Sequence, residues 1–334
     1  MNRETFLKSV AFAGLGLSIN PSSLLARHRQ VNIGKRVGII GLDTSHSPAF
    51  ARALNAKVPD PMLKGYTVVA AYPYGSQSIA SSADRIPRFA NEVKALGVKI
   101  VDSIEELIDQ VDVVLLETND GRLHLEQAKP VFQAGKRMFI DKPIAASLHD
   151  AKAIFDAARH YNVPVFSSSS MRNISNINSL KSGEAIGPIA GVDVYSPAKL
   201  EPTHPDLMWY GIHGVEMLYA IMGEGCKEVR RIFSADTDIV IGTWADGRVG
   251  TFRGIRKGMA GYGGIAFGER GQQRIGKYEG YLPQLYQIIE FFETGVAPVP
   301  STETIEMMAF MEAADASKFK GGEGVNLADF LDRG

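Results

Sequence analysis

The sequence predicts an α/β protein in which a doubly wound parallel sheet is followed by an α+β domain with an open, mostly antiparallel sheet. Short apolar strands alternate with helices over residues 36–168, as they do in parallel sheets that carry helices on both faces. Over residues 228–253 strands follow one another without intervening helices, which is typical of antiparallel sheets. The chain has 334 residues, enough for two domains, and we place these domains at residues 31–168 and 169–334.

The strands of the first domain are short, rich in β-branched residues and apolar on both faces, as buried parallel strands are. Ser103 and Glu106 form a capping box that begins a helix, and Gly135 ends the helix before the fifth strand. Ligands of doubly wound sheets bind outside the carboxyl ends of the strands, so the loops that follow the strands are candidate site segments. In chain order we predict strands at 36–41, 67–72, 98–101, 111–117, 137–140 and 163–166, with helices at 48–58, 86–96, from 104 onward, 123–133 and 148–159.

The second domain is predicted to contain strands at 191–196, 228–235, 239–244 and 248–253. Asp246-Gly247 favours a hairpin turn between the last two of them. The glycine-rich run 258–264 lacks the lysine and the helix that follow in a phosphate-binding loop, so we interpret it as a substrate-side loop or bulge. One face of this sheet is free to pair with a second copy, and we therefore expect a homo-oligomer.

The composition excludes several classes of protein. With 36 Lys+Arg against 37 Asp+Glu, the chain lacks the broad basic field of most nucleic-acid binders, so we expect no nucleic-acid partner. The single cysteine, Cys226, can form neither an internal disulfide nor a cysteine-based metal cluster. No apolar run reaches the roughly 18 residues that a membrane-spanning helix needs, so we expect no membrane span.

The first thirty residues have the layout of an export signal. A short basic start precedes an apolar run over residues 10–17 and a stretch of small residues. Residues 3–8 resemble a twin-arginine signal in which Glu4 replaces the second arginine. We therefore expect residues 1–30 to direct the protein to the periplasm, with a cytoplasmic protein that carries a loose amphipathic N-terminus as the alternative.

Residues 124–143 contain a histidine, a helix that ends in Ala-Gly-Lys, an apolar strand and then Asp141-Lys142-Pro143. In this order and spacing they resemble the Gfo/Idh/MocA oxidoreductases, whose members carry Glu-Lys-Pro at the last position. Residues 211–216 resemble the family's Gly-x-His-x-x-Asp, and residues 304–318 resemble its final helix. The resemblance extends over residues 36–330. It implies a Rossmann domain, NAD or NADP as cofactor, and a sugar, polyol or related compound as substrate.

Two residues are the catalytic candidates that the resemblance implies. Lys142 would lie between nicotinamide and substrate, where its charge stabilises an alkoxide; the alternative is a surface salt bridge to Asp141. His213 would handle the hydroxyl proton, a role that suits an ordinary histidine pKa near 6.5; the alternative is a buried structural histidine. Glu216 lies on the same helix face as His213, and would orient it or contact sugar hydroxyls; the alternative is a structural residue.

The predicted cofactor loop departs from the family's Gly-x-Gly-x-x-Gly, since residues 41–46 keep only its first glycine. Asp43 brings negative charge to the place of the diphosphate, which is unfavourable unless the side chain turns away or caps the helix. The second strand ends without the acidic residue that binds a ribose 2′-hydroxyl, and this favours NADP or weakened NAD binding. The predicted cofactor-binding residues are Gly41, Asp43, Thr44, Ser45, His46, Ser76, Asn119, His124, Asp141 and Lys142.

The predicted substrate-binding residues are Arg172, Trp209, Tyr210 and Glu216. Arg172 would grip a carboxylate or phosphate, or else form an ion pair that links the domains. Asp43 and His46 form an Asp-x-x-His pair, but no further ligand lies near them in the sequence. We therefore expect a hydrogen-bonded turn there, and no metal site.

The function that follows is an oxidoreductase that moves hydride between NAD or NADP and a secondary hydroxyl of a carbohydrate-like compound. Two alternatives remain open. The loss of two loop glycines is also what a ligand-binding or regulatory member of the family would show. A cofactor that is retained would suit a glycosidase that uses tightly bound NAD.

Overall fold

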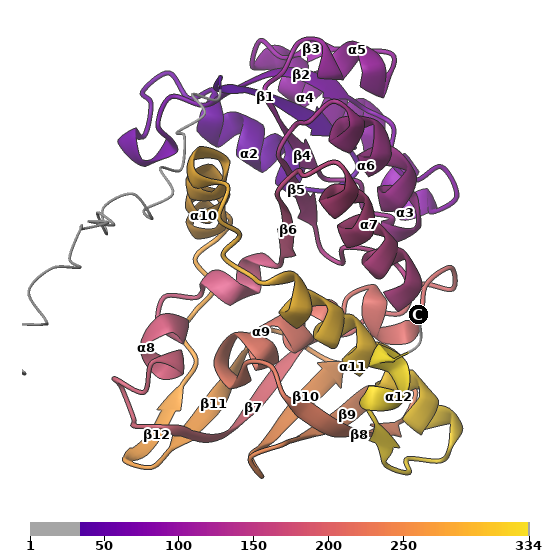
Figure 1. Ribbon diagram of the computed structural model, residues 1–334, viewed down its shortest axis with the longest axis vertical. Helices are drawn as coiled ribbons and strands as arrows, with labels where there is room; N and C mark the ends of the chain where they lie inside the picture. The colour runs from indigo at the N-terminus through magenta and orange to yellow at the C-terminus, as the bar shows by residue number, and fades with distance from the viewer. Residues whose placement is uncertain (1–33, 333–334) are drawn as a thin grey trace, which may run out of the picture. The chain divides into compact units, whose positions relative to one another are not determined.

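The computed structural model describes residues 34–332 (Figure 1), so the predicted export signal lies outside the described residues. Its first sheet contains six parallel strands in the order β3-β2-β1-β4-β5-β6. This confirms the predicted doubly wound sheet, with its switch point between β1 and β4. The strands are β1 (Arg36–Ile40), β2 (Thr67–Tyr72), β3 (Lys99–Ile100), β4 (Val113–Leu116), β5 (Met138–Asp141) and β6 (Val165–Ser168).

Helices cover both faces of this sheet because alternate strand residues point to opposite faces. Val114 and Leu116 pack with α5 (Ile104–Ile108), α6 (His124–Gln133) and α7 (Leu148–His160). Val113 and Leu115 pack with α2 (His46–Leu54), α4 (Ile86–Ala95) and α10 (Leu282–Thr294). The apolar residues of both faces are almost completely buried.

Helix α10 comes from the far end of the sequence and was not predicted. Its apolar residues Leu285, Ile288 and Phe292 are fully buried against the first sheet. The predicted second domain therefore supplies one helix to the core of the first. The domain boundary at residues 168 and 169 stays a prediction.

A local signal in the sequence places the start of α5 correctly, whereas the end of α2 depends on a contact with the sheet. Ser103 Oγ accepts a hydrogen bond from the backbone N–H of Glu106 at 3.0 Å, which is the predicted cap of α5. Helix α2 ends four residues earlier than predicted. The side chain of Asn55, directly after it, exchanges two 2.8 Å hydrogen bonds with the backbone of Val68 in β2. This contact ties the end of α2 to the sheet.

The second sheet has seven strands in the order β12-β11-β7-β10-β9-β8-β13. All neighbouring pairs are antiparallel except β7 with β10, which confirms an open, mostly antiparallel sheet. Helices α9 (Ile212–Met222) and α11 (Ser301–Phe319) pack against it. The strands are β7 (Ile189–Pro197), β8 (Cys226–Phe233), β9 (Thr237–Trp244), β10 (Val249–Ile255), β11 (Gly263–Gly268), β12 (Gly271–Arg274) and β13 (Val325–Asn326).

The glycine-rich run of the second domain is only partly a loop, because β11 begins at Gly263. A Cβ atom on Gly264 would lie 2.3 Å from the carbonyl oxygen of Asp193, so two strands approach more closely here than other residues allow. The face of the second sheet that lies opposite α9 and α11 exposes Tyr195, Val249 and Ile265. The expected homo-oligomer stays a prediction.

Three short α-helices complete the α-helices of the described residues: α3 (Ala80–Ala83), α8 (Ile177–Lys181) and α12 (Ala328–Leu331). Within residues 34–332, every helix is too short or too polar to cross a membrane.

Candidate active site

A pocket of about 120 Å³ lies where the carboxyl ends of β1, β4 and β5 meet the second domain. The residues after these strands reach it because parallel strands end at one edge of a sheet. Eight of its lining residues were predicted as site residues: Thr44, Ser45, His46, Asn119, Lys142, Trp209, Tyr210 and His213. Sequence reasoning missed Arg85, Ser170, Met171, Tyr278 and Tyr281, and reached Tyr262 only as part of the glycine-rich run.

Lys142 directly follows β5, and its side chain is only 10% exposed. Its Nζ lies 3.3 Å from Oδ2 of Asp141, so the ion pair considered as an alternative does form, but inside the pocket. Burial opposes the charge of the ammonium, but the Asp141 carboxylate outweighs burial and raises the pKa of Lys142. Lys142 is therefore a fixed positive charge at the bottom of the pocket at neutral pH.

His213 lies in the first turn of α9, with Nδ1 2.7 Å from the hydroxyl oxygen of Ser169. Ser169 Oγ also accepts a hydrogen bond from the backbone N–H of Met171, which fixes its position. Burial, reinforced by the charge of Lys142, lowers the pKa of His213 well below its usual value. The imidazole is therefore neutral at pH 7, and Nε2 is the ring nitrogen left for a ligand.

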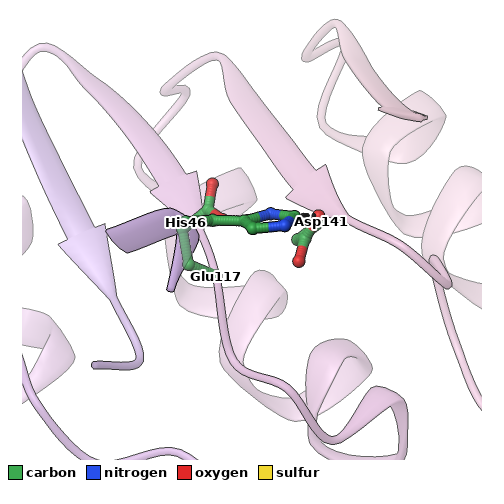
Figure 2. A group of neighbouring side chains, drawn as sticks. All are labelled: His46, Glu117 and Asp141. Atoms are coloured by element: carbon green, nitrogen blue, oxygen red, sulfur yellow. Dashed lines mark ion pairs between the residues drawn. The ribbon is translucent and has the colours of Figure 1, made fainter. Parts of the chain in front are cut away.

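Three buried side chains, His46, Glu117 and Asp141, lie close together (Figure 2), and His46 also lines the pocket. His46 Nδ1 lies 3.0 Å from Asp141 Oδ1 and 3.7 Å from Glu117 Oε2. Burial disfavours a charged imidazole, but the two carboxylates outweigh it and raise the pKa of His46 to about 10. Burial, together with the Asp141 charge, raises the pKa of Glu117 to about 7. We call these three residues the His46 triad.

One imidazole nitrogen and two carboxylate oxygens within 4.8 Å are also a donor set that divalent metals accept. With its raised pKa His46 would be protonated, and together with Lys142 it would balance the charge of the two carboxylates. The Asp-x-x-His turn expected from the sequence is not the contact that forms, since His46 pairs with Asp141. Glu117 was missed, although an acidic residue at the end of an apolar strand was its signal.

The His46 triad predicts a pH-dependent stability. A folded pKa of about 10, raised above the ordinary 6.5, contributes stability that is complete below pH 6.5 and is lost as pH rises through 10. We expect the free energy of unfolding to fall by about 1 kcal/mol per pH unit between pH 7 and 10. Urea denaturation of wild type and His46→Gln measures this slope.

His160→Gln is the matched control, because His160 is an exposed histidine at the end of α7. We expect this control to keep the wild-type dependence of the unfolding free energy on pH. If His46→Gln also keeps it, His46 is not protonated in the folded protein.

Asp43 does turn away from the start of α2, as the sequence allowed. Its buried carboxylate accepts hydrogen bonds from the backbone N–H groups of Ser76, at 2.9 Å, and Asn119, at 3.0 Å. These residues belong to the loops after β2 and β4. Burial raises the pKa of Asp43 to about 6. We call this pair of bonds the Asp43 clasp, and it closes the crevice at the switch point of the sheet.

A second cavity, of about 640 Å³, is lined by side chains from three segments, within residues 72–78, 102–105 and 120–130. Ser76 lines this cavity and Asn119 lines the smaller pocket, so the clasp lies between the two. A dinucleotide would find room for its two ends in the two cavities. The clasp places the Asp43 carboxylate between the two cavities, where the diphosphate would lie. Its negative charge would oppose the diphosphate unless the carboxylate is displaced or protonated.

Removal of the clasp is expected to improve dinucleotide binding. A dinucleotide that displaces the Asp43 carboxylate must break two charge-assisted hydrogen bonds, each worth roughly 1.5–3 kcal/mol. We expect Asp43→Gly to bind NADPH or NADH at least about tenfold more tightly than wild type, as measured by titration of nicotinamide fluorescence. The affinity of Asp43→Asn, which keeps the shape and one acceptor oxygen, should lie between that of wild type and that of Asp43→Gly. Unchanged affinity in Asp43→Gly would rule out the clasp as the obstacle.

Seven predicted site residues do not line this pocket: Gly41, Asp43, Ser76, His124, Asp141, Arg172 and Glu216. Arg172 Nε donates to Glu216 at 2.7 Å and its Nη2 pairs with Glu303 at 2.6 Å, so its charge is compensated by two buried carboxylates, and its role as a substrate ligand stays a prediction. Glu216 also accepts a 3.0 Å hydrogen bond from the N–H of Ser169, and so positions the partner of His213. His124 contacts the carbonyl oxygens of Thr118 and Ile144 with its two ring nitrogens, which orders the loops after β4 and β5.

Comparisons with known proteins agree with this arrangement. Residues 35–169 match the model of the GFO_IDH_MocA oxidoreductase family, NAD-binding Rossmann fold. Over 113 residues the chain is 34% identical to 1,5-anhydro-D-fructose reductase of Ensifer adhaerens, and over 167 residues 26% identical to glucose-6-phosphate 3-dehydrogenase of Bacillus subtilis. These matches cover 33% and 48% of this chain, and only 33% and 42% of the two relatives.

Solved structures are similar over more of the chain. A probable dehydrogenase from Thermotoga maritima has a TM-score of 0.72 at 21% identity and covers 88% of this chain and 99% of its own. Scyllo-inositol dehydrogenase from Lactobacillus casei, solved with NAD(H) and scyllo-inositol, has a TM-score of 0.66 at 15% identity, with 88% and 99% covered. At these identities the likeness establishes the fold.

Proposed function

We propose that this chain, whose residues 35–169 match the model of the Gfo/Idh/MocA oxidoreductases, is an NAD(P)-dependent enzyme of that family that oxidises or reduces a secondary hydroxyl of a sugar, polyol or related compound. The observation that carries the proposal is that Lys142 and His213 line one pocket at the carboxyl edge of the first sheet. The nicotinamide, when bound, would exchange a hydride with a carbon of the substrate. The other requirements of the reaction fall to side chains of the protein.

Lys142 and His213 have complementary charges for this chemistry. The ammonium of Lys142 would contact the substrate oxygen and stabilise the negative charge that develops there. Neutral His213 would accept the hydroxyl proton at Nε2 during oxidation, and return it during reduction. Ser169 holds the ring at Nδ1, and Glu216 holds Ser169 through its backbone N–H.

The walls of the pocket support a carbohydrate-like substrate. Five aromatic side chains line it: Trp209, Tyr210, Tyr262, Tyr278 and Tyr281. Tyrosine and tryptophan combine a flat apolar face with a polar group, and a sugar ring likewise has apolar C–H faces rimmed by hydroxyls. At about 120 Å³ the pocket is smaller than the roughly 300–1,000 Å³ of common small-molecule sites, so it would hold one ring or the reacting end of a longer ligand.

The Asp43 clasp favours a second candidate function, a ligand-binding member of the family that has given up the cofactor. Its two hydrogen bonds hold together the loops between which a dinucleotide would lie. In that case Lys142 and His213 would bind a ligand without redox chemistry.

Cofactor content separates the two functions. The purified full-length chain would be denatured and the supernatant assayed for NAD(H) and NADP(H), and the refolded or cofactor-free protein would be titrated with NADH and NADPH. We expect retained nucleotide or saturable binding of one of the two. If neither is released and neither binds, the redox proposal is excluded and the ligand-binding function stands.

A further inference from the structure

The pocket is lined by three positively charged side chains, His46, Arg85 and Lys142, by the neutral His213, and by no acidic side chain. The charges of His46 and Lys142 are compensated by buried carboxylates. His46 pairs with Asp141 and lies near Glu117, and Lys142 pairs with Asp141. The two cations and two carboxylates together carry almost no net charge.

Arg85 is different, because its guanidinium has no counter-ion. Within residues 34–332 its side chain forms no ion pair and no hydrogen bond, although it is only half-exposed. Other arginines of intermediate exposure in this chain are paired, such as Arg172 with Glu216 and Arg248 with Asp246. A cation that lines a pocket and lacks a partner there is available to a ligand.

The backbone around Arg85 is held at the pocket. Asn119, which lines the pocket, donates a 2.9 Å hydrogen bond from Nδ2 to the hydroxyl oxygen of Ser82. The N–H of Arg85 donates to the carbonyl oxygen of Ser82 at 3.0 Å. The chain before α4 is therefore tied to the loop after β4, and Arg85 is positioned before any ligand arrives.

We propose that this pocket binds a ligand that carries a phosphate or carboxylate group, and that Arg85 is the residue that recognises that group. A guanidinium matches both groups through two parallel N–H donors. Thr44 and Ser45, on the same wall, offer hydroxyl donors to further oxygens. The proposal deepens the proposed function, on which it rests for the role of the pocket: the anion would belong to an acidic or phosphorylated sugar, or to the diphosphate of the cofactor.

The test is isothermal titration of the full-length wild type, Arg85→Gln and Arg88→Gln. Arg88 is the matched control, since it lies one turn further along α4, is 68% exposed and pairs only loosely with Glu92 at 3.8 Å. The probes are inorganic phosphate, pyrophosphate, the pair glucose 6-phosphate and glucose, and ADP-ribose. We expect Arg85→Gln to bind the anionic probes roughly 10- to 100-fold more weakly than wild type, with Arg88→Gln unchanged.

The different probes show whether the anion belongs to the substrate or to the cofactor. A loss confined to glucose 6-phosphate assigns Arg85 to the substrate, and a loss confined to ADP-ribose assigns it to the cofactor; either supports an anion site. Equal affinities in wild type and Arg85→Gln, or no saturable binding of phosphate or pyrophosphate to wild type, would overturn the proposal. If Arg85-dependent phosphate binding is found but NAD(P) does not bind, only the redox function fails.

Discussion

Lys142→Met is expected to turn over the substrate at least roughly 10²–10³-fold more slowly than wild type. The substitution removes the positive charge at the bottom of the pocket, and with it the group that stabilises negative charge on the substrate oxygen. The fold should persist, because Asp141 keeps its 3.0 Å contact with His46. Steady-state rates on a substrate identified by screening sugars and polyols against NAD and NADP measure this effect, with the melting temperature as a check on folding.

Two variants make this result specific. Lys142→Arg keeps the charge but changes its geometry, so we expect partial recovery of kcat. Lys99→Met removes a 58%-exposed lysine that pairs with Glu106 far from the pocket, and we expect wild-type rates. Wild-type turnover by Lys142→Met would refute the role that we assign to the charge.

Arg172→Met is expected to destabilise the protein by about 3–5 kcal/mol, since it leaves a buried pair of carboxylates without their cation. Glu216 and Glu303 are 2% and 4% exposed and both contact Arg172. The midpoint of urea denaturation measures the change. The double variant Arg172→Met, Glu303→Gln should regain part of the loss, because one of the two orphaned charges is then removed.

A surface arginine provides the comparison for this substitution. Arg36 pairs with Asp112 at 2.8 Å, but its side chain is 56% exposed, and exposed pairs contribute little to stability. Arg36→Met should therefore leave the urea midpoint close to that of wild type. A similar small change in Arg172→Met would show that the buried carboxylates find other partners or become protonated.

The sequence predicted those parts of the structure that depend on neighbours along the chain. Apolar runs with helices between them define the first sheet, and the Ser103 cap is a contact over three residues. Lys142 and His213 were found because each lies in a short motif. The pocket brings the two motifs together, as a doubly wound sheet with a second domain at its carboxyl edge requires.

The parts that could not be predicted depend on contacts between distant segments. Glu117 becomes a partner of His46 only because β1 and β4 are neighbours in the sheet. Arg85 and Tyr281 line the same pocket although almost two hundred residues separate them, and no local pattern marks either. For Asp43 the sequence showed a carboxylate where the diphosphate is expected. Only the folded loops show which backbone N–H groups donate hydrogen bonds to it.

The return of α10 to the first sheet also has a consequence for how the protein is made. During synthesis the strands and helices up to residue 168 leave the ribosome long before residues 282–294 do. Until then the residues that α10 later covers, among them Phe166 and Phe139, lack part of their apolar cover. The two domains cannot mature one after the other. The core of the first domain is therefore incomplete until nearly nine-tenths of the chain has been translated. Until then its uncovered apolar residues are exposed to non-specific association.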